Sequence, residues 1–580
     1  MRQTRWGLLA ATAALATVAA GAAMAADLPV RKAAPVEYVR VCTAYGAGFF
    51  YIPGTDTCLR VGGRARFSYQ YMSSRQLGPT ITGVNAANSL VNRDNSAFQS
   101  LTFLNFDARS QTSYGTLRTF IRVIAAYSSG GYLTSGTAQR FGTAYPALGQ
   151  DTFGRAQSLI YLDKAFIQFA GFTAGRAGSF FDFYAHDLEH YAATSGSDVQ
   201  STNLLAYTAT FGGGWSATLS VEDPISRRQP LYSNLAFGTT GVGTPFSLLN
   251  DQVAGLTTVG GTFTQSVPYT APDGSLRFAN YDVAQRSLMP DIVGAIRYDA
   301  PWGSAQVSGA VRELRGGALV NTIGTATSAL TGLVAPSGAA AQGIGTVPAG
   351  LPGRVREEIG YAIQGGMKLN LPQLATGDVL WLQAAYSEGA LSYAGHPARF
   401  AGSEALSSPY SGRFAVSTVD SFIGRDGKQK LTEAWSVTAA FLHYWAPDWR
   451  SAVFGSYAEV NFGKGARSGN SPGNLIPGTL PLVGSSAGAN SLAFNTTLRD
   501  YSVAVIGANL IWSPVRDLDV GLEGVYTRVS LKNGRAADLS YGSALLPSAT
   551  GPGTAVNGVP ARTAKYDDVW SVRMRVQRDF

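Results

Sequence analysis

Two short motifs in the sequence could carry catalytic chemistry, but neither has the surroundings that this chemistry needs. His186-Asp-Leu-Glu-His190 has the histidine spacing of a zinc-binding helix, yet aspartate replaces the glutamate base and no helical pattern surrounds it. Gly484-Ser-Ser486-Ala-Gly488 spells a nucleophile elbow, yet it lies in a Gly- and Ser-rich stretch without a flanking strand and helix. We therefore expect no metal site, no cofactor and no catalytic serine.

A second set of residues could act through charge alone. Segment 181–202 carries four acidic residues, and seven arginines lie at alternating positions of four other segments. Acids and arginines that face each other across water would create a transverse field, which orders polar solutes and penalises apolar ones. The acids are Asp182, Asp187, Glu189 and Asp198; the arginines are Arg64, Arg66, Arg109, Arg118, Arg122, Arg573 and Arg575.

The composition limits the elements that could position these charges. Charged residues make up 14% of the 580 residues, against roughly 25% in soluble proteins. Hydrophobic residues make up 45%, which is too many for a disordered chain, and the mean hydropathy of +0.03 disfavours a bundle of membrane helices. The net charge of +8 is dispersed, without the aromatic-interleaved basic run of a nucleic-acid groove.

Hydrophobic residues recur with a period of two at both ends of the chain. From Leu59 to Tyr71 every odd position is apolar, aromatic or Gly, and the even positions are Arg, Gly, Ser or Gln. From Trp570 to Phe580 the same alternation returns. Because side chains of a strand alternate between two faces, one face is apolar and the other is polar. Strands of this length with aromatic ends match the apolar band and the aromatic girdles of an outer-membrane barrel.

Sixteen such segments separated by alternating short and long connections predict an antiparallel barrel. Seven connections are short and rich in Gly, Pro, Asp and Ser, and we expect them to be turns at the periplasmic end. Eight are long, and we expect them to be extracellular loops. In lipid an open sheet edge would leave backbone groups unpaired, so the sheet must close, and sixteen strands leave a water-filled lumen. The segments are 59–71, 101–112, 115–127, 159–169, 173–180, 203–211, 215–222, 289–298, 304–313, 361–371, 378–387, 434–445, 449–462, 501–512, 517–531 and 569–580.

Closure of the barrel would bring the charged residues together. The first and last strands become neighbours, so the arginines would form one basic wall, and segment 181–202 would be the third long loop. Its aromatic residues suit packing against a wall. We therefore predict that this loop folds inward and constricts the lumen opposite the basic wall. In the alternative interpretation the acids lie on a solvated outer loop, and the arginines pair with lumen carboxylates such as Asp107 and Glu523.

The N-terminal 58 residues precede the predicted barrel of 59–580. Residues 1–25 have the basic start, the apolar stretch and the Ala23-Met24-Ala25 site of a cleaved signal peptide, with a membrane anchor as the alternative. Residues 26–58 would form a periplasmic segment. Cys42 and Cys58 are the only cysteines, and in an oxidising compartment we expect them to form one disulfide, with two free thiols as the alternative.

The mature N-terminus, Ala26-Asp-Leu-Pro-Val-Arg-Lys to Cys42 and then Tyr45-Gly-Ala-Gly-Phe-Phe-Tyr to Arg64, strongly resembles the general porins of alphaproteobacteria. Ser179-Phe-Phe-Asp-Phe183 and the terminal Phe580 resemble that family as well. The resemblance implies a trimeric sixteen-stranded porin that passes ions and small hydrophilic solutes, with its third loop inside the pore. Phe580 looks like the signal read by the outer-membrane assembly machinery.

The favoured hypothesis is therefore a passive diffusion porin of the outer membrane, in contact with its lipid and lipopolysaccharide. A gated receptor would need a plug domain, and the residues before Leu59 are too few for one. An outer-membrane barrel hydrolase would need a convergent catalytic cluster, which the four scattered histidines do not supply. The remaining alternative is a secreted all-β adhesin, which would be extracted in buffer, whereas a porin requires detergent.

Overall fold

The computed structural model describes the parts of the chain on which the fold depends. The predicted signal peptide, His190, Asp198 and Ser486 lie outside the described residues. These are 40–73, 96–129, 157–189, 194–197, 201–228, 258–259, 262–270, 276–282, 286–317, 319–323, 353–396, 416, 419–424, 428–463, 466, 498–537 and 563–580.

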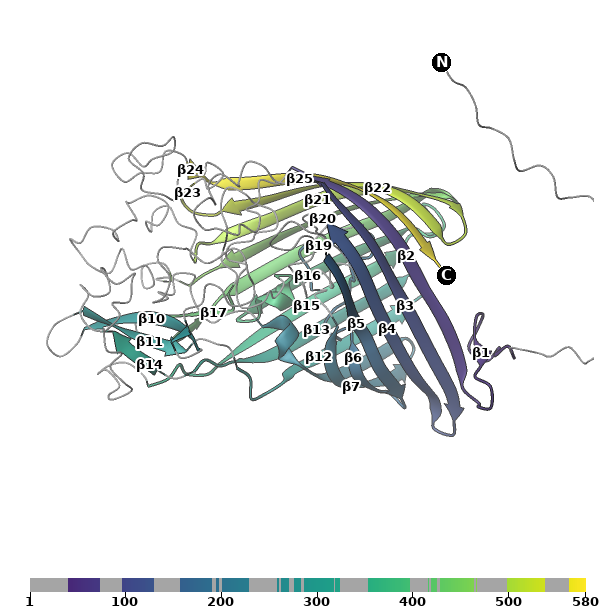
Figure 1. Cartoon of the computed structure of the whole chain (residues 1–580), viewed down its shortest axis with the longest axis horizontal. Helices are drawn as coiled ribbons and strands as arrows, with labels where there is room; N and C mark the ends of the chain where they lie inside the picture. Colours follow the sequence, from purple (N-terminus) through teal and green to yellow (C-terminus); the bar gives the residue numbers. More distant parts are fainter. Residues whose placement is uncertain are drawn as a thin grey trace, which may run out of the picture.

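Sixteen strands form one closed antiparallel barrel, so the predicted fold class is confirmed (Figure 1). Each lies on one of the sixteen predicted segments. They are β2 (Cys58–Met72), β3 (Ser96–Thr112), β4 (Gly115–Ser129), β5 (Gln157–Phe169), β6 (Phe172–Ala177), β7 (Thr202–Gly212), β8 (Trp215–Glu222), β12 (Asp291–Ala300), β13 (Gly303–Leu314), β15 (Glu358–Asn370), β16 (Val379–Glu388), β19 (Glu433–Ala446), β20 (Trp449–Asn461), β21 (Tyr501–Val515), β22 (Leu518–Leu531) and β25 (Tyr566–Asp579).

The barrel closes where β25 pairs with β2. Arg64 lies opposite Asp579 in this seam, and the pairing continues to Met72 opposite Ser571. β25 also pairs with β22, and β2 with β3, so none of these strands has a free edge. Backbone groups at a free edge would stay unpaired in lipid, where each costs several kcal/mol, because no water reaches them.

Alternation along each strand separates an apolar outer face from an inner face. In β15 the side chains of Ile359, Tyr361 and Ile363 are exposed, whereas the intervening Ala362 and Gln364 are buried. Aromatic rings pair on the outer face near both ends of the barrel, as Trp449 with Trp512, Trp215 with Tyr298, Tyr71 with Trp570 and Trp435 with Tyr457. Two aromatic girdles around an apolar band are the outer surface of a membrane barrel.

The seven short connections lie at one end of the barrel, as predicted, at the right in Figure 1. Gly303 is required at one of them, because its φ is +145° and an added Cβ would overlap the carbonyl oxygen of Lys368. No helix among the described residues is long and apolar enough to cross a membrane.

The N-terminal segment lies at this same end. β1 (Phe50–Tyr51) pairs with the start of β2, and Cys42 and Cys58 form the predicted disulfide. The guanidinium of Arg109 lies over the rings of Tyr45 and Phe49, so the segment also contacts β3.

Elements that the period-two pattern did not predict lie in the long connections. β9 (Thr258–Val259), β10 (Thr262–Thr270), β11 (Leu276–Asp282) and β14 (Leu319–Ile323) form a separate four-stranded sheet beyond the barrel (Figure 1). Two-stranded sheets join β17 (Ser421–Ile423) to β18 (Gln429–Leu431), and β23 (Ala536–Ala537) to β24 (Thr563–Ala564). The short 3-10 helices are η1 (Pro224–Arg227) and η2 (Leu391–Ala394).

The inner face is not hydrophilic all round, which corrects one sequence-based expectation. On β20, β21 and β22 the inward side chains include Phe454, Val460, Val503, Val505 and Val529, and all are buried. They pack in one apolar cluster with residues of the connection between β16 and β19. Alternation separates the inward side chains from the outward ones. An inward side chain is nevertheless not in contact with water where a loop covers the wall.

The outer band gives a prediction about stability. We expect Ile363→Arg, near the middle of β15, to lower the free energy of unfolding by about 2–4 kcal/mol, because an arginine at the bilayer midplane is desolvated. Gln111→Arg, at an exposed inward position of β3, should cost far less. Urea titration in lipid vesicles measures both, and equal costs would contradict a lipid-facing position for Ile363.

Candidate constriction of the barrel lumen

The third long loop leaves β6 and crosses the lumen to the opposite wall. Gln364 of β15 donates its side-chain amide to the carbonyl oxygen of Phe181 at 2.8 Å, and Ser308 of β13 donates its hydroxyl to the same oxygen at 2.7 Å. Asn509 of β21 donates to the carbonyl oxygen of Leu188 at 2.7 Å. Polar side chains of the wall thus bind backbone groups that the loop cannot pair within itself.

Further contacts hold the two ends of the described loop. The backbone N–H of Tyr184 donates to the side-chain oxygen of Gln383 on β16 at 3.0 Å. The backbone N–H of Ser195 donates to the hydroxyl of Ser456 on β20 at 2.8 Å. Thr438 of β19 also donates its hydroxyl to the carbonyl oxygen of Ser195, so these contacts attach the loop to six strands, β13, β15, β16, β19, β20 and β21.

The aromatic residues of the loop pack against the wall. Phe181 and Tyr184 are buried, and Phe183 lies edge-on to Trp381 of β16, with ring centroids 5.2 Å apart. Gly366 of β15 makes room for Phe183, because an added Cβ would overlap its ring. The absence of a side chain at one wall position thus permits the inward path.

Glu189 is held by hydrogen bonds inside the loop. Its carboxylate accepts from the hydroxyl of Tyr184 at 2.7 Å and from the hydroxyl of Thr194 at 2.9 Å, and it lies 3.3 Å from Nδ1 of His186. Burial and the neighbouring Glu189 carboxylate raise the pKa of Tyr184 well above its usual value, so its hydroxyl remains a donor. His186 therefore belongs to a hydrogen-bonded cluster, and no group of three metal-ligating side chains occurs among the described residues.

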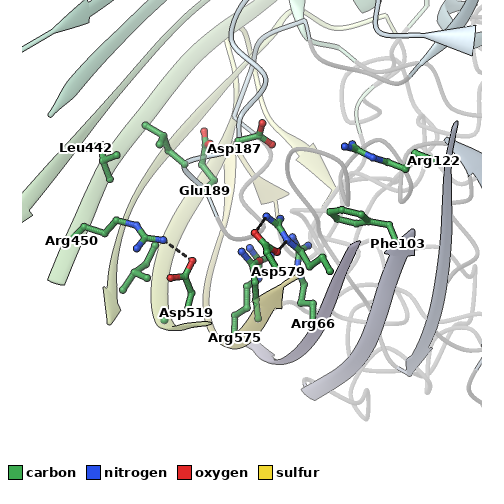
Figure 2. A pocket seen from close by; sticks show the side chains of 15 residues that line it. Arg66, Phe103, Arg122, Asp187, Glu189, Leu442, Arg450, Asp519, Arg575 and Asp579 are labelled. Atoms are coloured by element: carbon green, nitrogen blue, oxygen red, sulfur yellow. Dashed lines mark hydrogen bonds and ion pairs between the residues drawn. The ribbon is translucent and has the colours of Figure 1, made fainter. Parts of the chain in front are cut away.

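A cavity of about 450 Å³ lies between this loop and the wall of the barrel. Figure 2 shows Asp187 and Glu189 at the upper edge of the cavity, with Arg66 and Arg575 below and Arg122 to the side. Asp187 is exposed. The predicted site residues that line the cavity are Asp187, Glu189, Arg64, Arg66, Arg122 and Arg575. These residues come from the third loop, β2, β4 and β25, so segments far apart in sequence meet here.

Two ion pairs complete the lining. Arg450 of β20 contacts Asp519 of β22 at 2.6 Å, as Figure 2 shows, and Arg64 donates from Nη2 to Asp579 at 2.8 Å. Sequence reasoning missed Arg450 and Asp519 as site residues. Both occupy inward positions of predicted strands, so the parity rule that selected the other arginines could have found them.

The other predicted site residues lie elsewhere. Asp182 does not line the cavity, because its carboxylate accepts from Nη2 of Arg227 in η1 at 2.8 Å. Arg109 and Arg118 contact the carboxylate of Asp107 at 2.7 and 3.0 Å, which is the pairing considered in the alternative interpretation.

Arg573 is fully buried and donates to the side-chain oxygen of Gln70 at 3.2 Å, so it does not line the cavity either. Fewer arginines line the cavity than the sequence predicted, because Arg109, Arg118 and Arg573 lie elsewhere. The basic lining also includes Arg450 of β20, which was not predicted.

The family model described as Porin subfamily matches residues 27–545. This chain belongs to that family. It is 33% identical to Porin Omp2a of Brucella ovis over 219 residues, which are 37% of this chain and 58% of that porin. It is 30% identical to Porin Omp2b of Brucella abortus over 301 residues, which are 51% of this chain and 62% of that porin. The chain thus spans about six-tenths of the length of these relatives.

Solved outer-membrane channels also align with the porin chain. The channel DcaP of Acinetobacter baumannii has 12% identity and a TM-score of 0.46, and the alignment covers 91% of this chain and 99% of DcaP. An anion-selective porin from Comamonas acidovorans has 10% identity and a TM-score of 0.37, with 90% and 100% covered.

Family membership confirms the sequence-based assignment to the porins and the outer-membrane location. It also supports the expectation that the chain is not an enzyme.

The buried Tyr184–Glu189 contact gives a prediction about loop stability. We expect Tyr184→Phe to cost about 1–3 kcal/mol, because the buried Glu189 carboxylate loses a donor. Tyr457→Phe is the matched control, since Tyr457 donates to Glu459 at the same 2.7 Å on a partly exposed pair. The midpoint of heat-induced unfolding in detergent measures both variants. Equal shifts would mean that burial does not strengthen the Tyr184 contact.

Proposed function

We propose that this porin is a passive diffusion channel for ions and small hydrophilic solutes. The observation that carries the proposal is the charged cavity between an inward loop and the wall of a closed barrel. A solute in such a passage replaces part of its hydration with polar side chains of the lining, and its size and charge decide whether it passes. Family membership supports the same function.

We further propose that the third loop is the constriction. Asp187 and Glu189 would form its acidic edge, and Arg64, Arg66 and Arg575 the facing basic edge. A field across the lumen aligns dipolar solutes and disfavours apolar ones, because an apolar solute displaces oriented water without replacing its interactions. Asp182 would act in holding the loop, not in the field, because Arg227 neutralises it.

We propose a homotrimer as the assembled form. One structural observation supports a protein contact on the outer face of the short strand β6. By alternation Arg176 follows Phe172 and Ala174 on that face, and its Nε donates to the carbonyl oxygen of Leu162 at 3.0 Å. An arginine facing lipid costs free energy, which a neighbouring subunit could offset by covering it.

We also propose that lipopolysaccharide contacts the outer rim and that the assembly machinery reads Phe580. Phe580 is 63% exposed, and its backbone pairs with Gly63. It is therefore accessible as a terminal signal even in the closed barrel.

Ion selectivity tests the proposed constriction. We expect Asp187→Asn, alone and together with Glu189→Gln, to raise the anion-to-cation permeability ratio at least about twofold, because the facing arginines keep their charge. Asp568→Asn is the control, since it removes the same charge at an exposed position of β25. The reversal potential of planar bilayers in a salt gradient gives the ratio.

Two results would count against the proposals. A wild-type protein that carries no current in bilayers would contradict the channel. If the protein conducts but all three variants have the ion selectivity of the wild type, the proposed acidic edge is contradicted, whereas the proposed channel is not.

A further inference from the structure

The connection between β16 and β19 also enters the barrel. It was predicted as one of the long outer loops, but its described parts, 389–396 and 416–432 with gaps, are largely buried. Leu391, Tyr393, Ala394 and Ile423 are each 0% exposed. A surface loop does not bury its whole helix, so this connection is packed as a core element.

This connection packs against the apolar inner wall of β20–β22. Leu391, Val419 and Phe422 belong to the same buried cluster as Phe454 and Val503 of the wall. The cluster also includes Tyr184 of the third loop. The connection thus covers wall residues that would otherwise face water, and it shares one buried cluster with Tyr184, which donates to Glu189.

A buried ionic network fixes the connection to the barrel. Arg312 of β13 contacts Asp291 of β12 at 3.1 Å and Asp420 of the connection at 3.3 Å. Asp420 also accepts from the backbone N–H of Leu391 at 2.8 Å, and Tyr393 donates its hydroxyl to Asp291 at 2.7 Å. A buried carboxylate is stable only with partners of this kind, so the network specifies one position for η2.

Arg227 joins the connection to the third loop. Its carbonyl oxygen accepts from the hydroxyl of Ser392 at 3.0 Å, and its guanidinium donates to Ser197 at 2.9 Å and to Asp182 at 2.8 Å. Burial by itself would lower the pKa of Arg227, but Asp182 and Tyr393 raise it above the usual value, so the guanidinium stays charged.

The two inward segments also touch through their backbones. Gly395 ends η2 with φ at +83°, and an added Cβ there would overlap the backbone nitrogen of Gly196 in the third loop. A residue with a side chain at position 395 would therefore separate the two segments.

We infer that the β16–β19 connection is a second constriction element. With the third loop it forms one folded unit inside the barrel, and its packing fixes how far Asp187 and Glu189 reach toward the arginine wall. Asp420 and Gly395 are positioning residues in this inference, because neither lines the cavity. The inference rests on the proposed channel, and it names the β16–β19 connection as the segment that sets the cross-section of the pore.

Unitary conductance and solute size exclusion test the inference. Asp420→Asn weakens the ionic network, and Gly395→Val separates the segments without changing any charge. We expect each to raise the unitary current at least about twofold and to admit larger neutral sugars in liposome swelling, because the third loop loses its support. The control is Lys532→Gln, which removes an ion pair with Glu459 on the outer face of β20.

Thiol labelling tests whether the connection is packed inside the barrel, even if those two variants do not assemble. Ala394 is completely buried, so Ala394→Cys replaces one small side chain by another inside the unit. In the assembled protein we expect it to resist a small charged thiol reagent that labels Asp187→Cys at the exposed edge.

The outcomes are distinct. Rapid labelling at position 394, or assembled variants with unchanged conductance and size exclusion, would overturn the inference. A wild-type protein without current would instead refute the proposed channel, and the labelling would still report whether the connection is packed inside the barrel.

Discussion

The structure depends on one constraint, that backbone hydrogen-bonding groups need partners wherever water is absent. In the wall this constraint requires a closed ladder, and the β2–β25 pairing supplies it. In the lumen the same constraint acts on the loops. The third loop has no strand partner, so Gln364, Ser308 and Asn509 of the wall bind its carbonyl oxygens. The barrel thus supplies both the closed wall and the hydrogen-bond partners that hold the third loop inside it.

The inner wall has two chemically different sectors. The sector of β2, β4 and β25 is rich in arginine and borders the cavity, together with Arg450 and Asp519 near the short-connection ends of β20 and β22. Nearer the long connections, the inner face of β20–β22 is largely apolar and is covered by inward segments. Hydrophobic burial and ionic lining are therefore combined within one lumen. The covered sector stabilises the loops by removing apolar surface from water, and the charged sector lines the cavity that the loops leave open.

The sequence predicted the wall better than its contents. Alternation is a local property, so sixteen strands and seven tight connections could be located from runs such as Leu59 to Tyr71. The partners of inward residues are not local. Asp182 pairs with Arg227, which lies 45 positions later in a connection without period-two alternation, and no pattern links the two. The same limit explains why the sequence did not predict the apolar cover over Val503, since its place in a strand is a local property but the connection that covers it is distant in sequence. β10 and β11 were missed because they form a hairpin outside the barrel, within a stretch dominated by small and polar residues.

The seam between β2 and β25 has a consequence for biogenesis. It joins strands from opposite ends of the fold, as the pairing of Gly63 with Phe580 illustrates. A nascent polypeptide that stops short of β25 exposes the edges of both β2 and β22, and such edges invite aggregation. This barrel therefore closes only when β25 is present, after all the other strands have been made.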